Sequence, residues 1–166
     1  MDPSLLLPTT SEQLFQVLNN LEIDYILHKH RPVYTVAEGH DVWKGIPGLH
    51  CRNLFLRDHK KKMFLIVAAN ETKIDLKDLK KQLNSGRLSF GSAERLWEFL
   101  GIQPGAVSPF CLINDKDRQV TLVLDPKMMD AERVNYHPLD NAMTIGIHPN
   151  DLLKFADYTG HLPSYL

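Results

Sequence analysis

The apolar residues of this chain recur at two spacings, one typical of helices and one typical of strands. Apolar positions three or four apart follow the capping-box pattern of Thr10-Ser-Glu-Gln13, which predicts a first helix over about residues 11–21. Similar spacing, together with capping residues such as Ser92 and Gly101, predicts four more helices, over residues 36–43, 76–83, 92–100 and 149–158.

Short runs of branched and aromatic residues predict the strands. Residues 53–56 and 63–67 are two such runs joined by a polar, basic connection, so they are expected to form a β-hairpin. Residues 110–113 and 120–124 flank Asn114-Asp-Lys-Asp117 in the same way and predict a second hairpin. Single strands are expected over residues 25–27 and 143–147. Strands that come in hairpins with helices between them predict a mixed α/β fold, with a largely antiparallel, curved sheet and helices packed around it.

Size and composition fit one domain over residues 1–166. A chain of 166 residues with 43% hydrophobic residues can bury an ordinary core. The longest apolar stretches, such as residues 63–69, are far shorter than the roughly 20 residues that a membrane helix requires. The N-terminus also lacks the order of a signal peptide. These features lead us to expect a cytoplasmic protein that has no membrane partner.

The charge of the chain is nearly balanced but unevenly distributed. A formal net charge of −1 argues against a general nucleic-acid binder that works by bulk phosphate neutralisation. Most lysines nevertheless fall between residues 60 and 81, where they could follow a phosphate backbone on one side of the molecule. The alternative is a solvated hairpin turn followed by a solvated helix face.

The usual catalytic machineries are missing from the sequence. The histidines form no metal-ligand pattern, although His28 and His30 would point the same way in an extended segment. Cys51 and Cys111 lie at predicted strand edges, where a buried apolar role is expected, and no Gly-x-Ser-x-Gly elbow is present. The glycines form no nucleotide-binding fingerprint. We therefore expect no metal and no cofactor, and a substrate that supplies much of its own reactivity, such as an aminoacyl ester on a ribose.

Four motifs in this order give the chain a family resemblance. They are Arg52-Asn-Leu-Phe-Leu-Arg-Asp58, Gly101-x-x-Pro-Gly-Ala-Val-Ser-Pro109, His137-Pro-Leu-x-Asn141, and Pro149-x-Asp-Leu-Leu-x-Phe155 with Thr159-Gly-His-x-Pro163. Together they resemble the YbaK-like aminoacyl-tRNA deacylases over nearly the whole chain. The resemblance is closest to the freestanding prolyl-tRNA editing proteins that clear Ala-tRNA(Pro), relatives of the insertion domain of bacterial prolyl-tRNA synthetase. It implies a barrel-like mixed sheet and a trans-editing hydrolase.

The resemblance implies catalytic roles for Arg52, Asn53 and His137. The family usually has lysine at the position of Arg52, where it reaches the aminoacyl or ribose end of the substrate. Arginine keeps the charge but is planar and forked, so the exchange is not neutral. Asn53 would bind the carbonyl or a water, and His137 would border the amino-acid pocket, contact the α-amino group or help to place water. Judged alone, the three residues would be a surface cation, a strand cap and a turn residue.

Substrate binding is implied for a loop and for two pairs of wall residues. The family's Gly-x-x-x-Pro loop orients the terminal adenosine of the tRNA, and it falls here on Gly105, Ala106, Val107, Ser108 and Pro109. Glycine lets the backbone approach the ribose, and proline stiffens the loop. The pocket walls are expected to include Tyr34, Thr35, Met143 and Thr144.

Partners and specificity follow from the same resemblance. The implied partner is tRNA, bound through its acceptor end, with tRNA(Pro) as the expected species and prolyl-tRNA synthetase as a further candidate. A small pocket would admit alanine and exclude proline, which a synthetase site built for proline cannot do. The ribose hydroxyl of the substrate would position the attacking water. Three alternatives stay open: a non-catalytic module that binds tRNA or a synthetase, a deacylase for serine, cysteine, threonine or 2-aminobutyrate, and a small-molecule hydrolase on the same scaffold.

Overall fold

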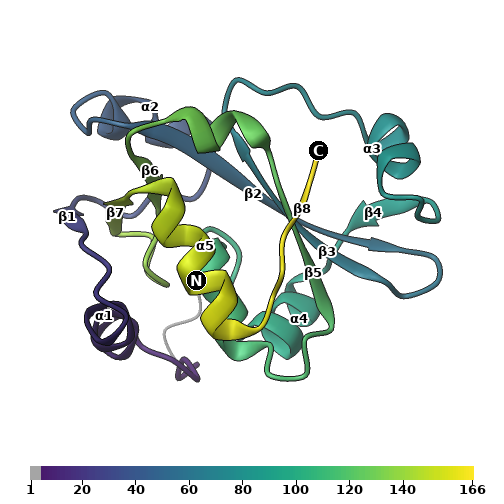
Figure 1. Cartoon of the computed structure of the whole chain (residues 1–166), viewed down its shortest axis with the longest axis horizontal. Helices are drawn as coiled ribbons and strands as arrows, with labels where there is room; N and C mark the ends of the chain where they lie inside the picture. Colours follow the sequence, from purple (N-terminus) through teal and green to yellow (C-terminus); the bar gives the residue numbers. More distant parts are fainter. Residues whose placement is uncertain (1–4) are drawn as a thin grey trace.

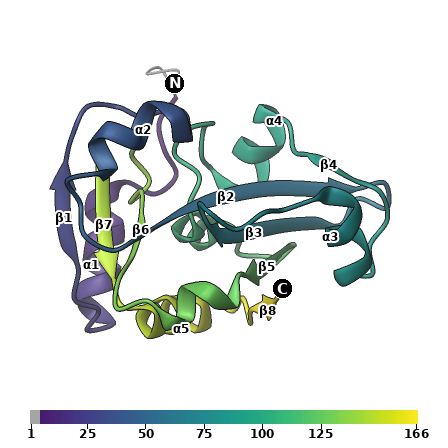
Figure 2. The same cartoon turned by 90° about the horizontal axis from the view of Figure 1, so that it is seen from above.

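A computed structural model of the protein describes residues 5–166, and every helix predicted from the sequence is present in it (Figures 1 and 2). The helices and short 3-10 segments are α1 (Ser11–Asn20), α2 (Val36–Trp43), α3 (Leu76–Gln82), α4 (Ala93–Arg95) with its π-helical continuation η1 (Leu96–Leu100), η2 (Pro109–Asn114), η3 (Pro126–Asp130) and α5 (Pro149–Thr159).

Local capping explains why the helices begin and end where the sequence predicts. Thr10 accepts a hydrogen bond from the Gln13 amide at 3.2 Å, and the Gln13 side chain accepts one from the Thr10 amide at 2.9 Å, which completes the predicted capping box. Ser92 caps α4 by accepting from the Arg95 amide. Gly101 ends the helical segment in the left-handed conformation, at φ 57°.

The strands form one mixed sheet around the long strand β2. They are β1 (Ile26–Lys29), β2 (Leu49–Asp58), β3 (Met63–Ala69), β4 (Leu88–Phe90), β5 (Val120–Leu124), β6 (Val134–Tyr136), β7 (Met143–Ile147) and β8 (Ser164–Tyr165). Their order is β1-β7-β6-β2-β3-β5-β8, and β4 pairs with β2. The predicted hairpin of residues 53–56 and 63–67 is confirmed, because β2 and β3 pair antiparallel.

Strand β2 joins the two ends of the molecule. Its first residues pair in parallel with β6, through Leu49 and Val134, whereas its later residues pair with β3 and β4. Figure 2 shows β1, β7 and β6 at one end of β2, and α3 and β4 at the other. The mixed α/β class predicted from the sequence is confirmed, with antiparallel pairing in β1–β7, β6–β7, β2–β3 and β2–β4 and parallel pairing in β2–β6, β3–β5 and β5–β8.

The predicted second hairpin is wrong. The apolar run 110–113 lies in the 3-10 helix η2, and β5 pairs in parallel with β3 instead. Ser108 starts η2 by accepting from the Phe110 amide at 3.2 Å, with Pro109 at the first position of the turn. Since Phe110, Cys111 and Leu112 are all buried, the run has no polar face, and such a run cannot distinguish a buried helical turn from a strand.

The core lies on both faces of the β2–β3 pair. A large cluster fills the space between the sheet and α1, η2 and α5, and includes Phe55. A smaller cluster lies under α3 and includes Leu56, with Leu54 packed against it. Because successive strand residues face opposite sides, Asn53 shares the side of Phe55, whereas Arg52 shares the side of Leu54. Neighbouring motif residues therefore approach the site from different faces of one strand.

Candidate active site

A cavity of about 370 Å³ lies where the N-terminal part of β2 meets α2 and the loop before η2. Its lining residues are Val33, Tyr34, Thr35, Val36, Trp43, Cys51, Arg52, Asn53, Leu54, Gly105, Val107 and His137. A much narrower hollow, of about 20 Å³, shares Trp43, Cys51, Asn53 and His137 with it and adds Thr144, among others. The two form a wide mouth and a narrow inner end, which we call together the editing pocket.

Arg52 is held at the mouth of the pocket by two residues behind it. One guanidinium nitrogen donates to the Thr72 carbonyl, and the Thr72 hydroxyl donates to the buried carboxylate of Asp125. Asp125 also accepts from the amides of Ala69 at 3.2 Å and Lys127 at 3.0 Å. Within residues 5–166 no carboxylate forms an ion pair with Arg52. Its positive charge is therefore fixed in place and available to a ligand.

Asn53 and Arg52 both carry buried polar atoms without partners. The side-chain oxygen of Asn53 and the Nε of Arg52 are buried and make no hydrogen bond to any group within residues 5–166. A buried polar group without a partner costs about 1–3 kcal/mol, so such atoms beside a cavity are candidates to form hydrogen bonds with a bound substrate. Asn53 offers an acceptor here, which suits a donor such as an α-amino group, while Arg52 offers a donor.

His137 presents a nitrogen lone pair to the pocket. Its Nδ1 lies 2.6 Å from the Met143 carbonyl, so Nδ1 carries the proton and donates it. Burial lowers the pKa of His137 below its ordinary value of 6.5. The hydrogen bond to Met143 raises the pKa of His137 and so partly offsets the effect of burial. The ring of His30, whose centroid lies 6.0 Å from that of His137, lowers this pKa further. The imidazole is therefore neutral near pH 7, with Nε2 as an acceptor.

A second histidine supports the inner end of the pocket and was not predicted from the sequence. His30 Nδ1 donates to the Arg31 carbonyl at 2.7 Å, and its Nε2 accepts from the Thr144 hydroxyl at 2.8 Å. Thr144 lines the inner end as expected, whereas Met143 lines neither part and contributes only its carbonyl. The sequence showed His30 only as a possible metal ligand. Within residues 5–166 no group of three histidine, cysteine or carboxylate side chains could hold a metal.

The loop from Gly105 to Pro109 has two kinds of residue. Gly105 and Val107 line the pocket, whereas Ala106, Ser108 and Pro109 are buried. Gly105 adopts φ +95°, and a Cβ atom there would lie 3.3 Å from the ring of Tyr34. Tyr34 and Thr35 line the pocket as expected. The three buried residues therefore hold the conformation of the loop. Only Gly105 and Val107 are placed to contact a ligand in the pocket.

Several lining residues were missed in the sequence because no local pattern connects them. They are Val33, Val36, Trp43, Cys51 and Leu54 at the mouth, and His50, Asn135 and Tyr136 at the inner end. Trp43 at the end of α2 stacks on His50 with ring centroids 5.6 Å apart. This contact joins α2 to β2 and closes one wall of the pocket. Only packing between separate elements brings these residues together.

Thiol nucleophiles are unsuited to the chemistry of this pocket. Burial raises the pKa of Cys51, which lines the pocket, to about 12, and it does the same to Cys111. Both thiols are protonated near neutral pH, and a protonated thiol is a poor nucleophile. Cys51 instead provides apolar surface, with its sulfur 3.5 Å from that of Met128.

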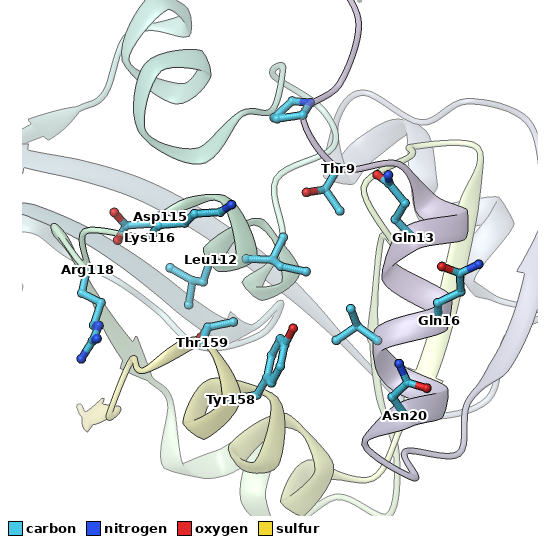
Figure 3. Close-up of a pocket in the computed structure, with 13 residues that line it drawn as sticks. Thr9, Gln13, Gln16, Asn20, Leu112, Asp115, Lys116, Arg118, Tyr158 and Thr159 are labelled. Carbon is cyan, nitrogen blue, oxygen red and sulfur yellow. The ribbon is translucent and has the colours of Figure 1, made fainter.

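A second hollow, of about 630 Å³, lies between α1 and α5, away from the motif residues of the editing pocket (Figure 3). Amide and hydroxyl side chains such as Gln13, Gln16 and Thr159 face it. Its acidic residue, Asp115, is engaged with His161 at 2.8 Å and with two backbone amides. None of Arg52, Asn53, Gly105 and His137 lines this hollow, so the editing pocket remains the candidate active site.

Comparison with known proteins identifies the family of the chain. The family model of the aminoacyl-tRNA editing domain matches residues 30–155, a range that includes every lining residue of the editing pocket. The chain belongs to the aminoacyl-tRNA editing domain family. The expectation of an aminoacyl-tRNA editing hydrolase is therefore confirmed.

Relatives of this editing domain carry prolyl-tRNA names. The prolyl-tRNA editing protein ProX of Acetoanaerobium sticklandii is 39% identical over 145 residues, which cover 87% of this chain and 88% of the relative. The prolyl-tRNA synthetase associated domain-containing protein 1 of Mus musculus is 37% identical over 159 residues, covering 93% and 94% of the two chains.

Solved structures share the fold of the editing domain. A candidate trans-editing enzyme for prolyl-tRNA synthetase superposes with a TM-score of 0.69 at 18% identity, covering 98% of each chain. Another structure, of a hypothetical protein, gives a TM-score of 0.72 at 16% identity and covers 92% of this chain and 97% of its own. In the part of the chain that the structure describes, no helix is long and apolar enough to cross a membrane.

Proposed function

We propose that this editing domain removes alanine from mischarged tRNA(Pro), binding the acceptor end of the tRNA in the editing pocket. The observation that carries the proposal is the convergence of Arg52, Asn53, Gly105 and His137, from three separate motifs, on one cavity. The unpartnered oxygen of Asn53 and the free Nε2 of His137 supply acceptors for an α-amino group or a water. The prolyl-tRNA names of the relatives support the choice of tRNA.

The inner end of the pocket supports alanine as the preferred amino acid. Its volume of about 20 Å³ leaves room for roughly one water-sized group, because a single water needs about 10–15 Å³ on this measure. A methyl side chain fits such a space, whereas the three methylene groups of the proline ring do not. Exclusion by size is the kind of discrimination that a synthetase site built for the larger amino acid cannot provide.

The proposed reaction is hydrolysis of the aminoacyl ester. Gly105 and Val107 receive the terminal adenosine, and Arg52 stabilises negative charge at the ester or at an adjacent phosphate. A water positioned by His137 Nε2 and by the free ribose hydroxyl of the substrate adds to the carbonyl carbon. The carbon–oxygen bond to the ribose then breaks, the ribose oxygen takes up a proton, and free alanine leaves. Positioning and charge stabilisation supply the rate enhancement, without a strong general base.

A panel of tRNA(Pro) charged with different amino acids tests the proposal. Purified protein should release alanine fastest, 2-aminobutyrate, serine, cysteine and threonine more slowly, and proline at the rate of buffer alone. Release of alanine at the buffer rate over a wide range of enzyme concentrations would rule out the hydrolase. Binding of the charged tRNA without release would instead identify a non-catalytic tRNA-binding module.

Substitutions of Arg52 test the role of the cation at the pocket mouth. We expect Arg52→Ala to lower kcat/KM by about 10- to 100-fold, since a charged hydrogen bond contributes roughly 1.5–3 kcal/mol. Arg52→Lys keeps the charge but loses the planar guanidinium that donates to the Thr72 carbonyl, so it should retain an intermediate rate. Arg57→Ala, on the same strand but outside the pocket lining, is the matched control. Equal rates for Arg52→Ala and the wild type would remove Arg52 from the mechanism.

A further inference from the structure

A groove extends from the mouth of the editing pocket along α3. A hollow of about 470 Å³ shares Arg52 and Leu54 with the pocket, and a further hollow of about 600 Å³ shares Leu76 and Lys77 with the first. The editing pocket and the two hollows therefore adjoin one after another, from the pocket to the outer end of α3. We call the two hollows beyond the pocket the α3 groove.

The α3 groove is lined by cations that no acidic side chain neutralises. Lys77, Lys80, Lys81 and Arg87 line it, and no ion pair within residues 5–166 involves any of them. Asp75, the acidic residue among the lining side chains, is occupied as the N-cap of α3 through the amides of Lys77 and Asp78. The chain as a whole has a net charge of −1, so this concentration of positive charge is local.

An exposed aromatic ring lies in the part of the groove nearest the pocket. Phe90 on β4 lines the same hollow as Arg52 and is 63% exposed. Strand β4 pairs with β2, with Phe90 opposite Leu56, and lies beside α3 (Figures 1 and 2). The ring is therefore held on the sheet, with open space in front of it. Aromatic faces of this kind stack unpaired bases without regard to their identity.

We infer that the α3 groove binds the 3′ strand of the tRNA acceptor end, with Phe90 stacking an unpaired base and the cations of α3 binding phosphates. This inference rests on the proposed function. The combination of an exposed ring and a line of cations matches single-stranded nucleic acid better than an acidic peptide, which has no bases to stack. From Leu76 to Lys81, α3 rises about 8 Å, which corresponds to roughly two nucleotide steps.

The test compares two substrates, alanyl-tRNA(Pro) and 3′-O-alanyl-adenosine, which lacks the rest of the strand. Lys80→Glu/Lys81→Glu should lower kcat/KM on the tRNA by about tenfold or more, mainly through KM, and the loss should exceed that on alanyl-adenosine by at least fivefold. Phe90→Ala should show the same difference between substrates. The control is Lys116→Glu/Lys154→Glu, which makes the same charge change outside the groove and should leave both rates within twofold of the wild type.

The outcomes separate the groove from the proposed function. If the wild type is active and both groove variants match it on tRNA, the inference is wrong and the function stands. If the wild type hydrolyses neither substrate, the proposed function fails. The Kd for uncharged tRNA, compared among the wild type, the groove variants and the control, then shows whether the α3 groove binds tRNA. Unchanged tRNA kinetics with weakened binding to prolyl-tRNA synthetase would assign the groove to a protein partner and overturn the inference. Thermal melts of all variants show whether a loss reflects misfolding.

Discussion

At the scale of single residues, one hydrogen bond decides what His137 can do. The Met143 carbonyl fixes the proton on Nδ1, which leaves the lone pair of Nε2 toward the pocket. A histidine in this state accepts hydrogen bonds from an α-amino group or a water but cannot donate through Nε2. The sequence places a histidine before a proline in a family motif, yet it cannot specify the tautomer, because the partner carbonyl belongs to another segment.

The state of His137 predicts how hydrolysis depends on pH. Burial lowers the pKa of His137 below 6.5, and the neutral form is the one proposed to act. The value of kcat/KM should therefore be constant above pH 6.5 and fall as the pH drops through the lowered pKa. His137→Ala should reduce the rate at pH 7 by about tenfold or more and remove this decline at low pH. A pH series from 5 to 8 on alanyl-tRNA(Pro) measures both effects.

The control for this pH series is His59→Ala, a change of an exposed histidine on the β2–β3 connection. It should keep both the rate and the low-pH decline of the wild type. A decline that persists unchanged in His137→Ala would assign the titration to another group.

At the scale of elements, the loop before η2 contains residues that are buried and residues that line the pocket. Its buried residues Ser108 and Pro109 start η2, whereas Gly105 and Val107 face the pocket. The conformation of Gly105, at φ +95°, is one that residues with a Cβ atom rarely adopt. Tyr34 lies close enough that an added methyl group would press against its ring. The proposed function uses this conformation for a close approach of the substrate to the loop backbone.

A pair of glycine substitutions tests this view of the loop. Gly105→Ala should destabilise the fold by about 1–3 kcal/mol, the usual cost of a strained backbone conformation, and should raise KM for charged tRNA. Gly160→Ala is the matched control, because Gly160 also has a positive φ, of +80°, but lies at the end of α5. It should show a similar loss of stability in urea unfolding with an unchanged KM. Equal KM values for the two variants would contradict a substrate contact at Gly105.

The helices and the first hairpin were predicted correctly because each depends on local signals. Capping residues such as Thr10 and Ser92 form hydrogen bonds within three residues of themselves. The strand predicted over 110–113 was wrong because its burial on all sides comes from η2 packing into the core. Strands β4, β6 and β8 were not predicted, since each has only two or three residues and exists by pairing with a distant segment.

At the scale of the whole molecule, charge is balanced overall and polarised locally. The net charge of −1 gives no general attraction to nucleic acid, while the α3 groove and Arg52 place cations along one continuous path. The lysines between residues 60 and 81 left two interpretations open in the sequence. Their positions in the fold favour the nucleic-acid interpretation for Lys77, Lys80 and Lys81, which share the groove with Phe90 and Arg52.

Salt should therefore affect the two substrates differently. Each phosphate contact to a single strand contributes a slope of about −0.7 to log K against log salt concentration. Two to four such contacts predict a slope of roughly −1.4 to −2.8 for log(kcat/KM) on alanyl-tRNA(Pro), measured below saturation. Alanyl-adenosine, which has no such phosphates, should show little dependence. Equal slopes for both substrates would place the salt effect in the chemistry of the pocket rather than in the groove.

The sequence by itself determined the helices, the β2–β3 hairpin, the mixed class and the family, because these depend on local patterns and motif order. Of the site residues that it suggested, Arg52, Asn53, Gly105 and His137 line one cavity, and their roles stay predictions. Only the tertiary structure decided that Arg52 is held by Thr72 and Asp125 and that His30 supports Thr144. It also decided that the pocket continues into a groove. These features join segments far apart in the chain, and packing, rather than any local pattern, sets the distances between them.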